Sequence, residues 1–209
     1  MKNYSLLQKL ISAIQVSALT VAGFCLASAS ALATPRSMLA NEGKIEFVVK
    51  EMGVPVAGSF QRFDAVIDID PVNAEKSSAN VRIDIGSLTT GNDEADALAI
   101  GPEWLDKAGA PYAIFRSVTI RELGKGHYEI KGTLSIRNKE RPIVIQFGTT
   151  DLPGGKTVIN SEFTLKRSEF GIGGGVWNQG GVVSEEIPVK VRFTLAPPAS
   201  GAGASATRK

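Results

Sequence analysis

Two residue types that carry much of protein chemistry are almost missing from this sequence. Its 209 residues include one cysteine, Cys25, and one histidine, His127. Zinc and copper sites draw most of their ligands from these two types, so neither site is expected, and no disulfide framework can form. A Ser-His-Asp arrangement would depend on His127, which follows Gly126 in a predicted turn, and no serine occurs in a G-x-S-x-G setting. We therefore predict no metal centre, no cofactor and no catalytic residue.

Patterns for acid–base chemistry and phosphate binding are missing as well. Asp68 and Asp70 are expected to share the solvent-facing side of a predicted strand, whereas a glycosidase needs two carboxylates that converge on a cleft. The glycine-rich run at residues 171–175 lacks the Gly-Lys-Ser/Thr ending of a phosphate-binding loop. We interpret it as a hairpin loop. Trp177 beside it is either packed into the core or placed at the mouth of a pocket.

The sequence has almost no charge surplus. Its 23 Lys and Arg residues stand against 21 Asp and Glu residues, and Lys2 and Lys9 account for the difference. The rest of the chain is formally neutral and offers no basic excess to hold phosphates. A nucleic acid is therefore not expected as a partner.

The first 33 residues have the pattern of a secretory signal peptide. Lys2 and Lys9 precede an apolar stretch at residues 10–26, and small residues follow up to an Ala-Leu-Ala sequence at residues 31–33. We predict cleavage after Ala33 and export from the cytoplasm. An uncleaved anchor is the alternative, but polar residues interrupt the apolar stretch, and no later segment is suited to span a membrane.

The remaining chain is expected to form one domain. Residues 42–196 carry the regular hydrophobic pattern, and residues 34–41 form a lead-in. Residues 197–209 consist mainly of small residues, proline and glycine, which bury too little surface to offset the entropy of ordering. They predict a disordered tail.

Apolar and polar residues alternate along most of the domain. Residues 128–136 and 187–195 are clear examples of this period, which is typical of a strand with one buried face. About eight such strands with Gly-, Asn- and Pro-containing turns predict an all-β antiparallel barrel or sandwich. Near-helical spacing in residues 92–109 predicts one or two short helices, the second starting near Pro102.

One strand has an irregular pattern. Phe115 is out of phase with Ile114, Val118 and Ile120, which would otherwise share the buried face. Either this strand contains a β-bulge or one of these residues faces outward.

Several segments resemble the YceI-like, polyisoprenoid-binding periplasmic proteins. The resemblance is carried by residues 44–60, by Pro-Tyr-Ala-Ile-Phe at 111–115, by Gly-Thr-Leu-Ser-Ile-Arg at 132–137 and by Lys-Arg-Ser-Glu-Phe-Gly-Ile at 166–172. These segments occur in the family's order. The resemblance implies a periplasmic protein with an eight-stranded, lipocalin-like antiparallel barrel and no catalytic activity. It also implies an interior channel for an isoprenoid lipid or a ubiquinone-type quinone.

One departure from the family concerns the polar end of such a ligand. Glu51 stands where the family commonly has a histidine, so a ligand's head group is not expected to be held at this position as the resemblance implies.

An eight-stranded barrel is wide enough either to be filled by side chains or to hold one slender ligand. Inward glycines such as Gly132 are expected to leave room for a ligand. Each candidate lining residue could instead be ordinary core. The candidates are Phe47, Val49, Phe60, Ile83, Leu98, Trp104, Leu105, Phe115, Phe163 and Phe170, with Trp177 at a mouth.

Three functions follow from these observations. The first is an extracytoplasmic carrier of a long-chain isoprenoid lipid. The second is a periplasmic interaction or stress-related protein with a closed barrel and no lipid. The third is a lipid hydrolase or isomerase, which the lone turn histidine and the missing metal ligands do not support. A homodimer is compatible with all three.

Overall fold

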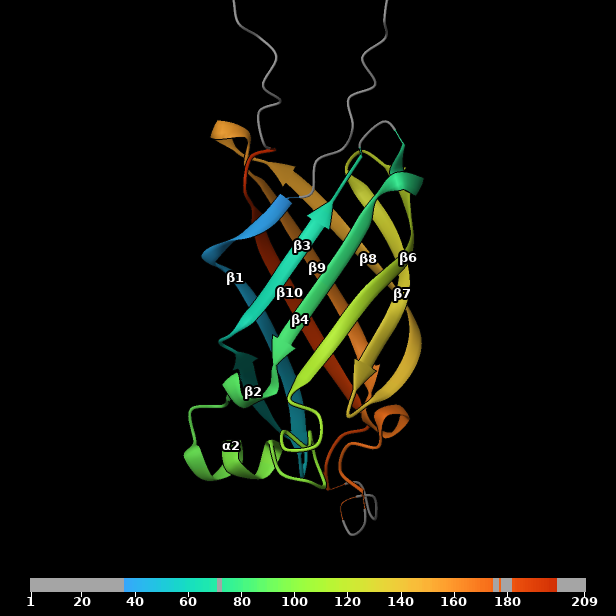
Figure 1. Ribbon diagram of the computed structural model, residues 1–209. Helices are drawn as coiled ribbons and strands as arrows, with labels where there is room; N and C mark the ends of the chain where they lie inside the picture. Colours follow the sequence, from blue (N-terminus) through green and yellow to red (C-terminus); the bar gives the residue numbers. More distant parts are fainter. Residues whose placement is uncertain (1–35, 71–72, 175–176, 178–181, 199–209) are drawn as a thin grey trace, which may run out of the picture. The chain divides into compact units, whose positions relative to one another are not determined.

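The computed structural model describes residues 36–70, 73–174, 177 and 182–198 (Figure 1). The predicted signal peptide at residues 1–33 lies outside the described residues, as does the predicted tail from residue 199 onward.

The described chain forms one antiparallel sheet that closes into a barrel. Pairing between β10 and β1 joins the two ends of the strand order, and eight strands make the closed ring. This confirms the predicted eight-stranded barrel. The strands are β1 (Arg36–Glu51), β2 (Val54–Phe60), β3 (Phe63–Asp68), β4 (Ser78–Asp84), β5 (Leu88–Thr89), β6 (Tyr112–Gly124), β7 (His127–Ile136), β8 (Lys139–Asp151), β9 (Thr157–Lys166) and β10 (Glu186–Leu195).

Strand β1 pairs with β10 along one edge and has two different neighbours along its other edge. Its first residues pair with β3 and its later residues, Ile45 to Glu51, pair with β2 in a hairpin. Strand β1 begins at Arg36, so the prediction that residues 34–41 are only a lead-in is wrong for the part from Arg36 onward. The strand starts early because Met38 pairs with Leu195 across the closing seam.

The irregular strand is β6, and it contains the bulge. The pairing of β6 with β7 shifts between Ser117 and Thr119, so an extra residue is accommodated there. Ile120 is fully buried after the shift, whereas Val118 is exposed. Both outcomes expected for this strand therefore occur: it contains a bulge, and the inward position is taken by Phe115 and not by Ile114 or Val118.

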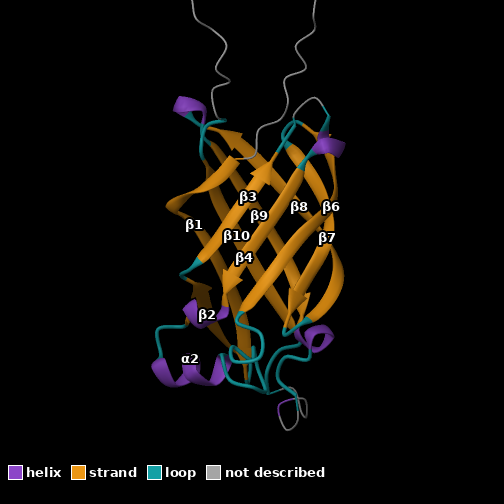
Figure 2. Cartoon of the chain, in the orientation of Figure 1, coloured by secondary structure: helices purple, strands orange, loops and turns teal. Residues whose placement is uncertain are grey.

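Helix α2 (Asp93–Ala99) lies at the same end of the barrel as the turn of the β1–β2 hairpin (Figures 1 and 2). The Asn92 side chain caps it by accepting hydrogen bonds from the backbone N–H groups of Glu94 and Ala95. The expected second helix near Pro102 is absent from the described residues. Residues 101–109 form successive turns instead, with Trp104 N–H donating to the Gly101 carbonyl.

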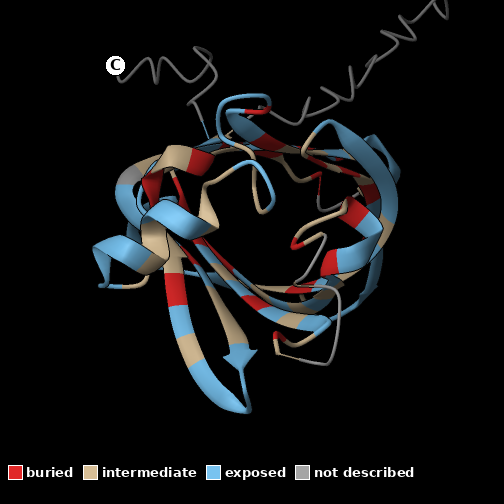
Figure 3. Ribbon diagram, turned by 90° about the horizontal axis from the view of Figure 1, so that it is seen from below, coloured by how far each residue is buried: buried red, intermediate tan, exposed pale blue. Residues whose placement is uncertain are grey.

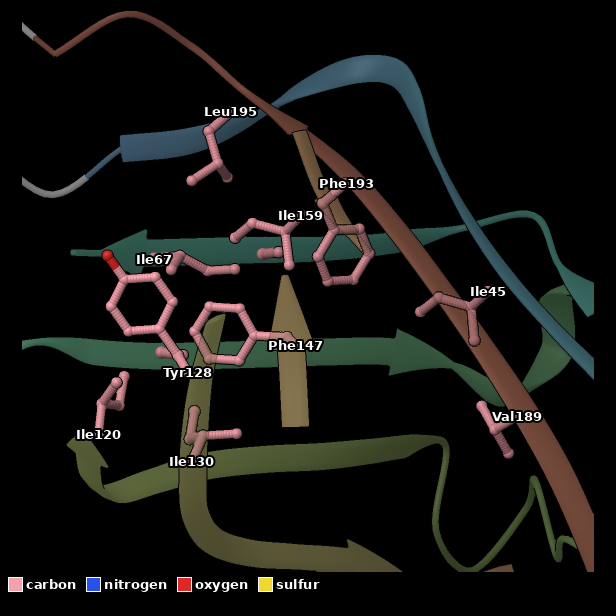
Figure 4. Packing of buried hydrophobic residues seen from close by; sticks show 12 residues of the cluster. Ile45, Ile67, Ile120, Tyr128, Ile130, Phe147, Ile159, Val189, Phe193 and Leu195 are labelled. Carbon is pink, nitrogen blue, oxygen red and sulfur yellow. The ribbon is translucent and has the colours of Figure 1, made fainter. Parts of the chain in front are cut away.

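The end of the barrel away from α2 is packed with large side chains. Ile120 and Leu195 are fully buried there, and the ring of Tyr128 stacks on Phe147 with centroids 5.1 Å apart (Figure 4). Seen along the barrel, the strands form a ring, and buried, intermediate and exposed residues alternate along them (Figure 3). The side chains inside the ring therefore decide whether a ligand can enter.

Candidate functional site

The barrel encloses a cavity of about 330 Å³. This volume falls at the lower end of the range of about 300–1,000 Å³ that is usual for small-molecule sites. The cavity extends from Ile67, Ile159 and Phe193 in the middle of the barrel to Leu98 and Trp104 at the α2 end. Nearly all of the lining side chains are apolar, so the cavity suits a hydrophobic chain.

Every lining residue predicted from the sequence borders this cavity. Whether they bind a ligand stays a prediction. They are Phe47, Val49, Phe60, Ile83, Leu98, Trp104, Leu105, Phe115, Phe163, Phe170 and Trp177. The six on strands, Phe47 to Ile83 together with Phe115 and Phe163, occupy inward positions of the period-two pattern. The other five come from α2 and from the turns and loops at the same end of the barrel.

Two aromatic rings lie against glycines in the barrel wall. A Cβ atom at Gly58 would be 2.3 Å from Cζ of Phe47, and one at Gly132 would be 2.5 Å from Cζ of Phe115. The room expected at Gly132 is taken directly by the Phe115 ring and not by a ligand. The glycines keep the rings close to the wall, and the lumen beside them stays open.

Two tryptophans meet where the cavity reaches α2. The rings of Trp104 and Trp177 have centroids 5.5 Å apart and are tilted by 59°. Trp104 Nε1 is buried and has no hydrogen-bond partner among the described residues. Leu98 borders the cavity and is also 47% exposed, which marks this end as the mouth. Trp177 therefore lies at the mouth of a pocket, one of the two positions expected for it.

Arg167 is a functional candidate that the sequence reasoning did not single out. It borders the cavity, and its side chain is only 6% exposed. The guanidinium donates to the carbonyl oxygens of Ile172, Gly173, Trp177, Val183 and Ser184 over 2.9 to 3.4 Å. It thereby connects both ends of the segment that carries Trp177. The sequence signal that could have found Arg167 is its place in the Lys-Arg-Ser-Glu-Phe segment, which resembles the family.

A second arginine fixes the turns next to Trp104. Arg137 occupies the β7–β8 turn with a φ of 52°. Its guanidinium donates to the carbonyl oxygens of Pro102, Glu103 and Gly171. Arg137 and Arg167 together hold the chain segments that carry the two tryptophans.

Polar groups in the lining are few and engaged with the protein itself. The Thr90 hydroxyl donates to Asp96, and the Ser161 hydroxyl donates to the Gln146 carbonyl. The bonds from Thr90 lower the pKa of Asp96. Glu51 is exposed at the end of β1, and no ion pair of its carboxylate is found within the described chain.

No group of three or more His, Cys, Asp or Glu side chains in the described chain could hold a metal ion. No helix among these residues is long and apolar enough to cross a membrane.

Comparison with known families identifies this architecture. The model of the YceI-like domain matches residues 37–195, which is most of the chain. The chain belongs to the YceI-like family. This confirms the resemblance read from the sequence segments.

Relatives of this YceI-like protein include UPF0312 proteins. One from Pseudomonas savastanoi is 27% identical over 161 residues, covering 73% of this chain and 84% of the relative. One from Vibrio cholerae is 32% identical over 102 residues, covering 48% of this chain. The chain spans about half the length of this Vibrio relative, 54%.

Solved structures of the same fold are also known. BcnA of Burkholderia cenocepacia is 28% identical, with a TM-score of 0.72, and the match covers 75% of this chain and 98% of BcnA. A polyisoprenoid binding domain from Saccharophagus degradans has a TM-score of 0.64 at 16% identity, covering 79% of this chain and 99% of that domain. The match to the Saccharophagus domain, at this low identity, shows a shared fold only.

Proposed function

We propose that this YceI-like protein binds a long-chain isoprenoid lipid, such as a polyprenyl lipid or a ubiquinone-type quinone, inside the barrel. The apolar cavity that reaches the mouth at Leu98 is the observation that carries this proposal. Transfer of each methylene from water to an apolar wall contributes about 0.8 kcal/mol, so a chain of several isoprene units binds with few polar contacts. The polyisoprenoid binding domain of the same fold adds support by analogy.

The protein would act as a carrier outside the cytoplasm, in the periplasm. The signal-peptide pattern of residues 1–33 supports this location. Binding without chemical conversion fits a cavity whose polar groups, apart from Glu51 and Trp104 Nε1, are occupied by hydrogen bonds to the protein.

The test is native mass spectrometry of the exported chain, followed by solvent extraction and identification of the lipid. One isoprenoid per chain is the expected result. The Ala79→Phe variant adds bulk to the lumen, since Ala79 borders the cavity, and it should lose the lipid. The Val144→Phe variant adds the same ring to the outer wall, where Val144 is exposed, and it should keep the lipid.

A bare protein that also takes up no added prenyl lipid would overturn the proposal. The closed-barrel interaction protein would then be the better description, and partners would be sought by crosslinking.

A further inference from the structure

Three exposed apolar side chains lie at the end of the barrel where the cavity opens. Met52 is 76% exposed and Val54 is 63% exposed in the β1–β2 hairpin, and Leu98 is exposed on α2. The hairpin and α2 are at the same end of the barrel (Figure 1). Single exposed apolar residues are common, but a group at the mouth of an apolar cavity marks an interaction surface.

The apolar lining continues from the lumen onto this surface. Val54 pairs with Glu51, and Val56 and Phe60, on the same face of β2, border the cavity. Val54 therefore extends the lumen face beyond the rim. Leu98 both borders the cavity and is exposed, so it connects the interior with the outside.

The tip of the hairpin carries an unusual residue for its backbone conformation. Met52 and Gly53 form the turn with φ of 47° and 84°. Asn or Asp is preferred over an apolar residue before Gly in such a turn. The chain thus places a long apolar side chain in solvent at a position where a polar residue would suit the backbone better.

We propose that this rim, made of Met52, Val54 and Leu98, docks onto the surface of a lipid bilayer. The three side chains enter the boundary between head groups and acyl chains, and the cavity mouth then faces the lipid. A ligand that is apolar along its length passes between bilayer and barrel without crossing water. This reason for docking rests on the proposed function, but the docking itself can be measured separately.

The charges near the rim indicate which lipid surface it suits. Lys50 and Glu51 at the end of β1 balance each other, and Asp93 and Glu94 form an acidic first turn of α2. An anionic surface would repel this turn. Docking is therefore driven by apolar contact, and an uncharged bilayer is the better partner.

The experiment is sedimentation of the exported chain with phosphatidylcholine vesicles. The variant Met52→Asn/Val54→Thr removes the apolar tip, and Asn suits the positive φ of the turn, so the fold is retained. The matched control is Val118→Thr/Val144→Thr, which changes two equally exposed residues on the barrel wall. The tip variant should bind vesicles about tenfold more weakly or worse, and the control should bind like the wild type.

Both variants should still bind an isoprenoid presented in detergent. Transfer of that isoprenoid to acceptor vesicles should be slower in the tip variant than in the control. Equal vesicle binding by the wild type and the tip variant would overturn the docking proposal. The proposal would also be overturned if the wild type formed a dimer, bound no vesicles, and became monomeric in the tip variant. The rim would then be the contact between two copies of the chain. Failure of all forms to bind isoprenoid in detergent would instead overturn the proposed function.

Discussion

The ring of Phe47 lies against Gly58, its partner across the β1–β2 pair, at a distance that no side chain on residue 58 would allow. The absence of a Cβ atom lets the ring rest near the wall. Space for a ligand thus depends on a residue that does not itself border the cavity.

The Gly58→Ala substitution is expected to push the Phe47 ring into the lumen. The new Cβ would lie 2.3 to 2.9 Å from three atoms of that ring, so the ring must move. We expect isoprenoid affinity to fall at least about tenfold, with about 1–3 kcal/mol of lost stability from overpacking. Binding by calorimetry and chemical unfolding would measure the two effects.

Gly148→Ala is the control for this prediction, because its Cβ would meet only the His127 side chain, at 3.9 Å. Unchanged affinity in Gly58→Ala would show that the ring does not limit the cavity.

Replacement of Arg167 by lysine should destabilise the protein despite retaining the charge. Lysine lacks the planar fork that reaches five carbonyl oxygens, so buried acceptors lose their donors. A loss of about 2–4 kcal/mol in the free energy of unfolding is expected. Arg192→Lys, at an exposed position of β10, is the comparison. Equal denaturation midpoints for the two variants would contradict the role given to Arg167.

The barrel and its lining follow from the sequence because both depend on a local period. Alternation along each strand decides which side chains point inward, and a closed antiparallel ring brings those side chains together. Phe47 and Phe163 could therefore be assigned to the lumen without knowing the strand order. The bulge in β6 could be suspected because Phe115 conflicted with the period.

Other features depend on contacts between distant segments, which a local pattern does not record. Arg167 looks like any charged residue after a strand until Val183 and Ser184 are brought beside it. Gly132 carries no sign that Phe115 from the preceding strand, β6, covers it. Asp70 was assigned to the wet face with Asp68, but it is buried and its N–H donates to the Ser77 hydroxyl.

The Asp68→Asn substitution should stabilise the protein at neutral pH. Burial, with a smaller contribution from the charge of Asp70, raises the pKa of Asp68. The folded state then binds protons more readily than the unfolded chain, so stability falls as pH rises through the folded-state pKa. Removing the charge should raise the free energy of unfolding at neutral pH by a few tenths of a kcal/mol to about 1 kcal/mol.

The gain from Asp68→Asn should vanish in acid, where Asp68 is protonated in the wild type as well. Asp64→Asn on the same strand is the control, because Asp64 pairs with Arg82 at 3.0 Å and its loss should give no gain. Thermal unfolding of the three proteins between pH 3 and pH 7 would check the prediction. A gain that persists at pH 3 would point to a cause other than charge.

Acid should loosen α2 and the mouth before it affects the barrel. Asp96 accepts hydrogen bonds from the Thr90 hydroxyl, at 2.7 Å, and from the Thr90 backbone N–H, at 2.6 Å. These bonds lower the pKa of Asp96 below its ordinary value of 3.8. The stability they supply is complete above that ordinary value and is lost as pH falls through the lower folded-state pKa.

The amide resonance of Thr90 is the probe for this step, since its N–H donates directly to the Asp96 carboxylate. It should titrate with the depressed pKa of Asp96, and the protection of the α2 amides against exchange, relative to the intrinsic rate at each pH, should fall over the same pH interval. The Asp96→Asn variant should show no such titration, whereas Asp93→Asn at the start of the helix should leave it in place. A Thr90 amide that titrates at the ordinary pKa of an aspartate would mean that the bond does not hold α2 against the barrel.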